Sequence, residues 1–254
     1  MDRAVDPVIL EDKVSESETK WLWVFGYGSL CWKPGFEFHK AVLGSVNGFA
    51  RRFWQGNATH RGTFDKPGRV ATLVEDSEEE VYGVAFAISG EAAIPYLNHR
   101  ECEQGGYISR FTEFSSLEGE TIKVLVYVAC PRNVHWLGDS DIEEIANQIV
   151  NRQGPSGHNV EYLIRLAEFM RLHFPDKHDG HLYSLEQKVL SLVEARQMCL
   201  RTLMGSGEGC VTFFRKPSSR ETSPNRARRN AEDRVETFEH TARVPGKKLR
   251  CLNI

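Results

Sequence analysis

Trp21-Leu22-Trp23-Val24-Phe25-Gly26-Tyr27-Gly28-Ser29-Leu30 is the stretch that decides where the fold begins. Its first five residues are apolar and rich in aromatic side chains, a composition typical of a buried strand, and glycine ends the strand. The twenty residues before it are mostly polar and charged. We therefore place the start of the folded domain near residue 21 and treat residues 1–20 as a polar N-terminal extension.

Strand-like segments continue through the first half of the domain, and helices follow in the second half. Segments rich in Val, Tyr, Phe and Thr predict strands over 21–27, 41–54, 69–75, 80–88, 107–114 and 121–130, with one short helix at about 90–103. Apolar residues at helical spacing predict three further helices, at about 140–153, 160–174 and 181–203. Strands first and helices afterwards predict an α+β fold, in which a small mixed or antiparallel β-barrel has flanking helices.

The composition is that of one globular domain with tails. The chain has 254 residues, of which 41% are hydrophobic and 26% are charged, so it can bury a core. Its uninterrupted apolar stretches are short, whereas a membrane-spanning helix needs about 20 residues. Acidic residues interrupt the apolar patch near the N-terminus, which is unlike a secretory signal. We expect a protein without a membrane span that resides in the cytosol.

Cysteine spacing and charge exclude several classes of partner. The six cysteines form no C-x-x-C pair and no Cys/His cluster at zinc spacing, so we expect reduced thiols and no metal site. The segment 21–204 has a net charge of −5 and no basic footprint, so nucleic acid is not an expected partner. Residues 205–254 carry eleven basic and six acidic side chains and few aliphatic ones. We expect this segment to be a disordered basic tail.

Two glycines flank Tyr27 where the first strand ends, and Ser29 follows them. Glycine permits a positive φ and lets a ligand approach the backbone, so the N–H groups of such a turn can hold a carboxylate or an oxyanion. A simple strand-ending turn explains the same pattern. A dinucleotide fingerprint is excluded, because Cys31 stands where its third glycine would be and no helix pattern follows.

A second candidate segment is 96–107, where a helix end is followed by a double glycine and a strand. Glu101 or Glu103 could act as a general base if an apolar pocket or a partner raised its pKa above the usual value of about 4.3. Solvated charges at a helix end are the alternative. A nucleophilic role for Cys102 is disfavoured, since no third group is assigned to orient His99.

Two cations stand beside two aromatic residues in Arg51-Arg52-Phe53-Trp54. They could bind the carboxylate of a small acidic ligand, but a surface pair with an aromatic anchor is an equally good interpretation. Tyr162, near the start of the second of the three predicted helices, is a further polar residue that could line a cleft.

Several motifs occur together in one order, and together they resemble the ChaC family, the glutathione-specific gamma-glutamylcyclotransferases. The motifs are VFGYGSL at 24–30, RRFWQG at 51–56, HRG at 60–62, GRVATLVED at 68–76, YLNHRE at 96–101 followed by GGY, and GPSGHNVEYL at 154–163. The set is far more specific than any one of its members. The resemblance covers residues 21–194 and leaves out the N-terminal extension and the basic tail.

The resemblance implies a gamma-glutamylcyclotransferase-like barrel over residues 21–204 and an intracellular carbon–nitrogen lyase without metal or cofactor. The reaction that it implies splits glutathione into 5-oxoproline and cysteinylglycine. In that family the glutamate after arginine in the YLNxRE segment is the general base, which maps onto Glu101, and Glu103 receives no role. The family's glycine turn holds the γ-glutamyl moiety and maps onto Val24, Phe25, Gly26, Tyr27, Gly28, Ser29 and Leu30. Arg52 and Tyr162 are further candidates for contacts with the carboxylates of glutathione.

Two alternatives stay open at this point. The same mechanism could act on other γ-glutamyl compounds, such as free γ-glutamyl amino acids or γ-glutamylamines. A non-catalytic binding regulator of a signalling pathway such as Notch, with an unknown protein partner, is the second alternative. The presence of Tyr27, Gly28, Ser29 and Glu101 favours an enzyme, because a non-catalytic relative would not need them.

Overall fold

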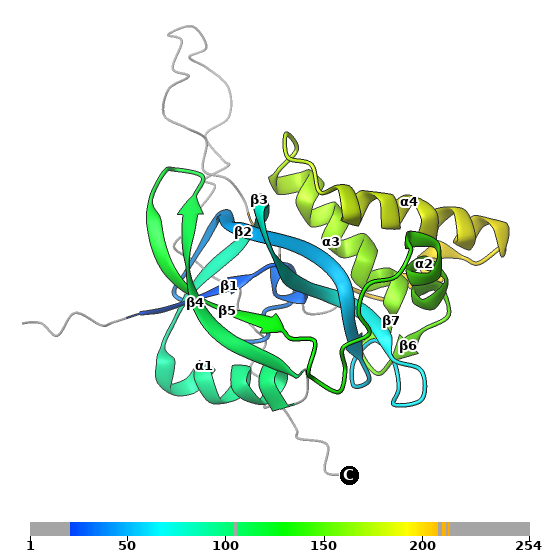
Figure 1. Ribbon diagram of the computed structural model, residues 1–254, viewed down its shortest axis with the longest axis horizontal. Helices are drawn as coiled ribbons and strands as arrows, with labels where there is room; N and C mark the ends of the chain where they lie inside the picture. The colour runs from blue at the N-terminus through cyan, green and yellow to red at the C-terminus, as the bar shows by residue number, and fades with distance from the viewer. Residues whose placement is uncertain (1–20, 104–105, 208–209, 212, 214–254) are drawn as a thin grey trace, which may run out of the picture.

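Five strands close into a barrel in the order β1-β3-β2-β4-β5 (Figure 1). The computed structural model describes residues 21–103, 106–207, 210–211 and 213, so the predicted N-terminal extension and most of the predicted tail lie outside the described residues. The α+β barrel expected from the sequence is confirmed. The strands are β1 Leu22–Gly26, β2 Lys40–Asn57, β3 Gly68–Ile88, β4 Tyr107–Ser116 and β5 Thr121–Ala129.

The barrel is mixed because one of its seams is parallel. β1 pairs antiparallel with β3 and parallel with β5, where Val24 lies opposite Leu125. The other pairs, β2 with β3, β2 with β4, and β4 with β5, are antiparallel. The parallel seam brings the end of β1, where the glycine turn begins, beside the second half of β5.

β3 is one strand of 21 residues, although the sequence predicts two strands at 69–75 and 80–88. The acidic residues between them stay extended because β2 pairs with both parts, across a register shift between Asn47 and Phe49. A second register shift separates Arg52 from Gln55 on β2. At this bulge the two intervening β2 residues lie opposite Ala71 alone, so the backbone groups of Ala71 need other partners.

Three of the helices gather on one side of the barrel, and α1 lies apart from them (Figure 1). The helix predicted over 181–203 is in fact two helices, because Gln197 adopts a φ of 54° between them. The short hairpin of β6 and β7 was not predicted. The bounds are α1 Gly90–Leu97, α2 Ile142–Val150, β6 Gln153–Gly154, β7 Gly157–His158, α3 Asn159–His173, α4 Gly180–Ala195 and α5 Leu200–Leu203.

The helices are attached to the barrel by side chains as well as by apolar packing. The amide of Asn159, at the start of α3, accepts a hydrogen bond from the backbone N–H of Arg69 at 2.6 Å and donates one to its carbonyl at 2.8 Å. Nε2 of His181, at the start of α4, accepts a hydrogen bond from the N–H of Phe53 at 3.1 Å. These contacts fix α3 and α4 against the bulged region of β2 and β3.

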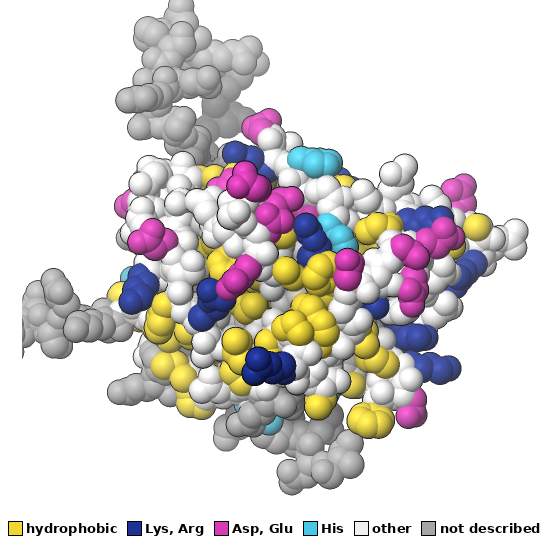
Figure 2. Space-filling model, viewed as in Figure 1, with side chains coloured by type: hydrophobic (Ala, Val, Ile, Leu, Met, Phe, Trp, Pro, Cys, Tyr) yellow, Lys and Arg dark blue, Asp and Glu magenta, His cyan; other side chains and the backbone are white. Residues whose placement is uncertain are grey.

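The face seen in Figure 2 has apolar side chains over the barrel, while acidic and basic side chains are interspersed around them. Beyond the predicted domain end at residue 204, Phe213 is buried and packs against Phe86 and Phe169. Within the described ranges, no helix is both long and apolar enough to cross a membrane.

Candidate active site

The turn after β1 contains a short 3-10 helix, Ser29–Cys31, that follows Gly28 directly. A Cβ atom on Gly26 would lie 2.6 Å from the Cβ of Leu30, where the turn folds back on β1. A Cβ atom on Gly28 would lie 2.6 Å from the hydroxyl oxygen of Tyr162. Neither glycine has a positive φ. Close packing therefore requires these glycines, rather than the left-handed backbone that a glycine turn suggests.

Three consecutive backbone N–H groups of this turn, those of Gly28, Ser29 and Leu30, donate no hydrogen bond to another described residue. The first N–H groups of a helical turn lack intrahelical partners, so this row of donors follows from the local fold. Gly28 and Ser29 are only half-buried. A ligand can reach such donors, and a carboxylate or an oxyanion is the group that they suit.

Glu101 lies in a π-helical turn, Asn98–Glu103, between α1 and β4. Its side chain is 16% exposed, and its Oε1 lies 3.0 Å from Nε of Arg100. Burial raises the pKa of Glu101 above its usual value, and the positive charge of Arg100 opposes that shift. A carboxylate in such an environment is a stronger base than a solvated one, which suits it to proton transfer near neutral pH.

Arg100 connects Glu101 to the glycine turn. While its Nε pairs with Glu101, its Nη2 donates a hydrogen bond to Oγ of Ser29 at 2.8 Å. The structure thus brings Ser29 and Glu101, which are far apart in the sequence, to one guanidinium group. Arg100 has no predicted role from the sequence, although it belongs to the YLNHRE motif at 96–101.

Two tyrosines converge on the backbone of Ala71 at the β2 bulge. Oη of Tyr162 accepts a hydrogen bond from the N–H of Ala71 at 3.2 Å, and Oη of Tyr107 donates one to the carbonyl of Ala71 at 3.0 Å. The bulge leaves these backbone groups available, so it determines where both hydroxyls lie. Tyr107 follows the double glycine in the sequence. Its position near Tyr162 was not predicted from the sequence, because it depends on how β4 lies in the folded barrel.

A third tyrosine, Tyr27, donates a hydrogen bond from its hydroxyl to the carbonyl of Tyr127 at 2.6 Å. Burial raises the pKa of Tyr27, of Tyr107 and of Tyr162, the last to about 12, and the negative charge of Glu101 raises each of them further. These hydroxyls therefore remain protonated and neutral beside Glu101. They can donate hydrogen bonds, but they cannot compete with Glu101 as a base.

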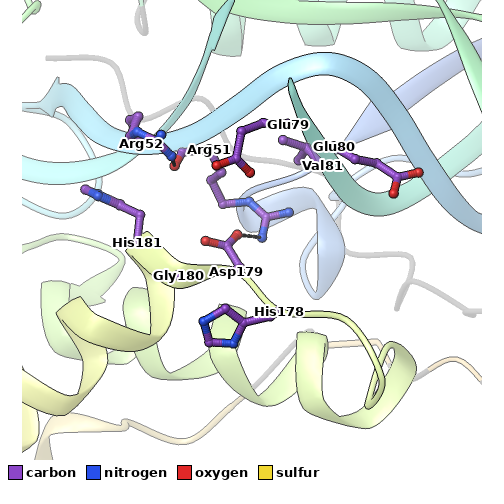
Figure 3. Close-up of a pocket in the computed structure, with 9 residues that line it drawn as sticks. All are labelled: Arg51, Arg52, Glu79, Glu80, Val81, His178, Asp179, Gly180 and His181. Carbon is purple, nitrogen blue, oxygen red and sulfur yellow. Dashed lines mark hydrogen bonds and ion pairs between the residues drawn. The ribbon is translucent and has the colours of Figure 1, made fainter. Parts of the chain in front are cut away.

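The remaining predicted site residues lie elsewhere. Val24 and Phe25 are fully buried in the core, so their side chains are part of the barrel rather than of a ligand-facing surface. Arg52 lies on the wall of a separate pocket of about 210 Å³ near the start of α4, together with Arg51, Asp179 and His181 (Figure 3). No turn residue and no Glu101 atom lines that pocket. A contact of Arg52 with substrate stays a prediction.

Arg51, the neighbour of Arg52, is held by partners within the protein. Its Nη1 lies 2.7 Å from Oδ2 of Asp179, and its Nη2 donates to the carbonyl of Tyr82. In the part of the chain that the structure describes, no group of three or more His, Cys, Asp or Glu side chains is placed to hold a metal ion.

Comparisons with known proteins identify the family of this chain. The family model described as "ChaC-like protein" matches residues 22–192. Glutathione-specific gamma-glutamylcyclotransferase 1 of Danio rerio is 46% identical over 177 residues, which cover 68% of this chain and 90% of the relative. The human protein of the same name is 44% identical over 180 residues, 69% of this chain and 81% of the relative.

Among solved structures, the crystal structure of a gamma-glutamyl cyclotransferase specific to glutathione from yeast is 30% identical to this chain. It superimposes with a TM-score of 0.61 and covers 67% of this chain and 96% of the yeast chain. The fold of this chain is thus similar to that of a solved gamma-glutamyl cyclotransferase. With its family match over residues 22–192 and its close relatives, the chain belongs to the ChaC-like family.

Proposed function

We propose that this protein degrades glutathione, releasing 5-oxo-L-proline and L-cysteinylglycine. The observation that carries the proposal is the pairing of Glu101, whose pKa is raised by burial, with a turn whose three N–H donors bind no other described residue. Arg100 and Ser29 join Glu101 to this turn. The names of the relatives from Danio rerio and Homo sapiens support glutathione as the substrate.

The proposed reaction is an intramolecular substitution. The α-ammonium group of the γ-glutamyl residue first gives a proton to Glu101. The free amine nitrogen then attacks the γ-carbonyl carbon and closes a five-membered ring, with negative charge on the carbonyl oxygen. When this intermediate collapses, the bond to the cysteinyl nitrogen breaks, and Glu101 returns its proton to that nitrogen. Glu101 then takes the second proton from the positively charged ring nitrogen, which becomes the neutral amide of 5-oxoproline, and passes it to the released amine, which leaves as an ammonium group. Atoms and protons balance without water, so the reaction is a lyase reaction.

Three effects supply the rate. Holding the amine against the carbonyl exploits the high effective concentration of an intramolecular nucleophile, which reaches about 10⁵ to 10⁸ M when the groups are well oriented. A positioned general base contributes roughly 10²- to 10⁴-fold. Each N–H donor aimed at the oxyanion contributes roughly 10²- to 10³-fold, and the turn at Gly28 to Leu30 supplies such donors.

The two other hypotheses are less well supported. Relatives named for glutathione favour this tripeptide over other γ-glutamyl compounds. The complete set of Glu101, Arg100 and the glycine turn favours catalysis over a purely regulatory protein. We further propose that the protein acts in the cytosol, since four of the described cysteines are free thiols, namely Cys31, Cys130, Cys199 and Cys210.

The decisive experiment follows both products by mass spectrometry after incubation with reduced glutathione. We expect the wild type to form 5-oxoproline and cysteinylglycine, and Glu101→Gln to be roughly 10²- to 10⁴-fold slower, because an amide of the same shape cannot take up the proton. The exposed Glu118→Gln variant is the matched control and should keep full activity. Circular dichroism verifies that both variants fold.

Either of two results would contradict the proposal. Undiminished turnover by Glu101→Gln would remove Glu101 from the mechanism. A wild type that forms 5-oxoproline from γ-glutamyl-alanine but not from glutathione would identify the broader γ-glutamyl substrates as the correct class.

A further inference from the structure

The guanidinium group of Arg100 is held on three sides by three different segments. Nε faces Oε1 of Glu101 at 3.0 Å, and Nη2 donates to Oγ of Ser29 at 2.8 Å. Nη1 donates to the carbonyl of Pro34 at 2.9 Å and also lies 3.3 Å from the hydroxyl of Tyr96. The Arg100 side chain is only 17% exposed. Its donors are thus committed to protein atoms, which leaves little capacity to bind a substrate carboxylate.

The two oxygens of the Glu101 carboxylate differ in their hydrogen-bond partners. Oε1 is paired with Arg100, whereas Oε2 accepts no hydrogen bond from another described residue. Oε2 thus has no partner among the described residues, while Oε1 of the same carboxylate is fixed. A proton donor can therefore approach Oε2 from a defined direction. The α-ammonium group of the γ-glutamyl residue is the donor that the proposed reaction provides.

We infer that Arg100 is a positioning residue, which fixes Oε1 of Glu101, ties Glu101 to the Ser29 turn, and leaves Oε2 as the oxygen that takes the substrate's proton. This inference rests on the proposed function for the identity of the proton donor. The placement of Glu101 by Arg100 is independent of it, since every contact that carries the placement lies within the protein.

Arg100 also controls the charge of Glu101. The described groups that face Glu101 from the other elements are neutral tyrosines, Tyr27 in the turn after β1, Tyr107 on β4, Tyr127 on β5 and Tyr162 on α3. Arg100 is the charged group among the described residues that lowers the pKa of Glu101, against the burial that raises it. Without Arg100, burial would act unopposed, and Glu101 would become protonated at a higher pH. A protonated glutamate cannot accept the substrate's proton.

Two substitutions separate charge from geometry. Arg100→Gln removes the charge and should raise the pKa of Glu101, which lowers the ionised fraction of Glu101 at a given pH on the acid side of its titration. Arg100→Lys keeps the charge but is a point donor that cannot bridge Glu101, Ser29 and Pro34 at once. For Arg100→Lys we expect a nearly unchanged pKa of Glu101 and a loss of kcat of about tenfold or more.

The measurement that tests the inference directly needs no turnover. ¹³C NMR titration of labelled glutamate side chains reports the pKa of Glu101, with the Glu101→Gln spectrum identifying its signal. Arg110→Gln is the matched control, because Arg110 is a surface arginine that pairs with Glu75. We expect the titration of Glu101 to move to higher pH in Arg100→Gln and to stay in place in Arg110→Gln.

Kinetics give the second readout. With glutathione as substrate, the acid limb of the pH profile should move to higher pH in Arg100→Gln, and KM should change by less than about threefold, since Arg100 holds protein atoms rather than substrate. A raised KM with an unchanged kcat would identify Arg100 as a substrate clamp and overturn the inference. So would a Glu101 titration that does not respond to Arg100→Gln.

Folding and function can be judged separately. If Arg100→Gln does not fold, Ser29→Ala removes one of the contacts of Arg100 and should shift the Glu101 titration in the same direction by a smaller amount, and an unshifted titration would overturn the inference. If the wild type does not cleave glutathione, the proposed function fails, while the NMR titration still decides the role of Arg100.

Discussion

Gly28 lies against the hydroxyl group of Tyr162, and this contact predicts that adding one methyl group, as in Gly28→Ala, lowers activity. The Cβ atom of Gly28→Ala would lie 2.6 Å from Oη of Tyr162, closer than real Cβ contacts allow. Either the turn or Tyr162 must move, and both border the proposed site. We expect the activity of Gly28→Ala to fall about 10- to 100-fold while the protein stays folded, as measured by glutathione turnover and thermal unfolding.

Combining Gly28→Ala with Tyr162→Phe shows whether the effect of Gly28→Ala comes from the clash with the Tyr162 hydroxyl or from a change in the backbone conformation of residue 28. Removing the hydroxyl makes room for the added methyl group, so the unfolding temperature of the double variant should lie above the value expected from adding the two single effects. Additive effects would show that Gly28 is needed for its backbone conformation instead.

Individual residues show why the sequence could predict part of the site but not all of it. Glu101 and the glycine turn belong to motifs of adjacent residues, so their resemblance to a family is visible in the chain itself. The bridge from Arg100 to Ser29 depends on side-chain direction between segments, which no spacing encodes. Arg52 shows what the sequence left undetermined. A cation beside aromatic residues suggested a ligand contact, and only the fold places Arg52 on the wall of a pocket near the start of α4.

Among the elements, α3 is tied to the loop between β2 and β3 by a buried carboxylate. Glu161 on α3 lies 2.6 Å from Nη1 of Arg61 and 2.8 Å from Nε of Arg165, and its side chain is 9% exposed. Glu161→Ala would leave Arg61 buried without its counter-charge, which costs about 3 to 5 kcal/mol. Denaturant unfolding should show this loss.

The control for Glu161 is the exposed pair of Glu75 and Arg110, whose side chains are 72% and 43% exposed. Glu75→Ala should change the free energy of unfolding by less than about 1 kcal/mol, because solvent screens exposed ion pairs. Equal effects of Glu161→Ala and Glu75→Ala would mean that burial does not set the strength of the Glu161 cluster.

Element boundaries were harder to predict than element types. Asp76 to Glu80 reads as a turn because its residues are charged and polar, yet pairing with β2 keeps it inside one long strand. The break between α4 and α5 depends on Gln197, whose left-handed φ has no signal in a non-glycine residue. In both cases a long-range or strained conformation prevailed over local propensity.

At the scale of the whole molecule, two tyrosines beside the β1–β5 seam of the barrel differ in how their hydroxyl groups are used. The hydroxyl of Tyr27 donates to the carbonyl of Tyr127, and this buried bond joins the turn after β1 to β5. Tyr27→Phe would leave that carbonyl without its donor, which costs about 1 to 3 kcal/mol. The hydroxyl of Tyr127 is itself buried without a partner among the described residues. Tyr127→Phe should therefore leave the free energy of unfolding unchanged or raise it.

Urea unfolding of both variants at one pH measures the contrast. A destabilisation by Tyr127→Phe as large as that by Tyr27→Phe would contradict the assignment of donor and acceptor. Circular dichroism of the folded state verifies that neither substitution alters the barrel.

The bond between Tyr27 and Tyr127 spans 100 positions of the chain, and it has a consequence for synthesis. A nascent chain on the ribosome exposes the glycine turn early, but the turn acquires its surroundings only after β5 and then α3 have emerged. Pairings of such long sequence separation form late in folding. The proposed lyase is therefore inactive during its own synthesis. A fragment released before α3 has been synthesised would not degrade the glutathione of the cell that produces it.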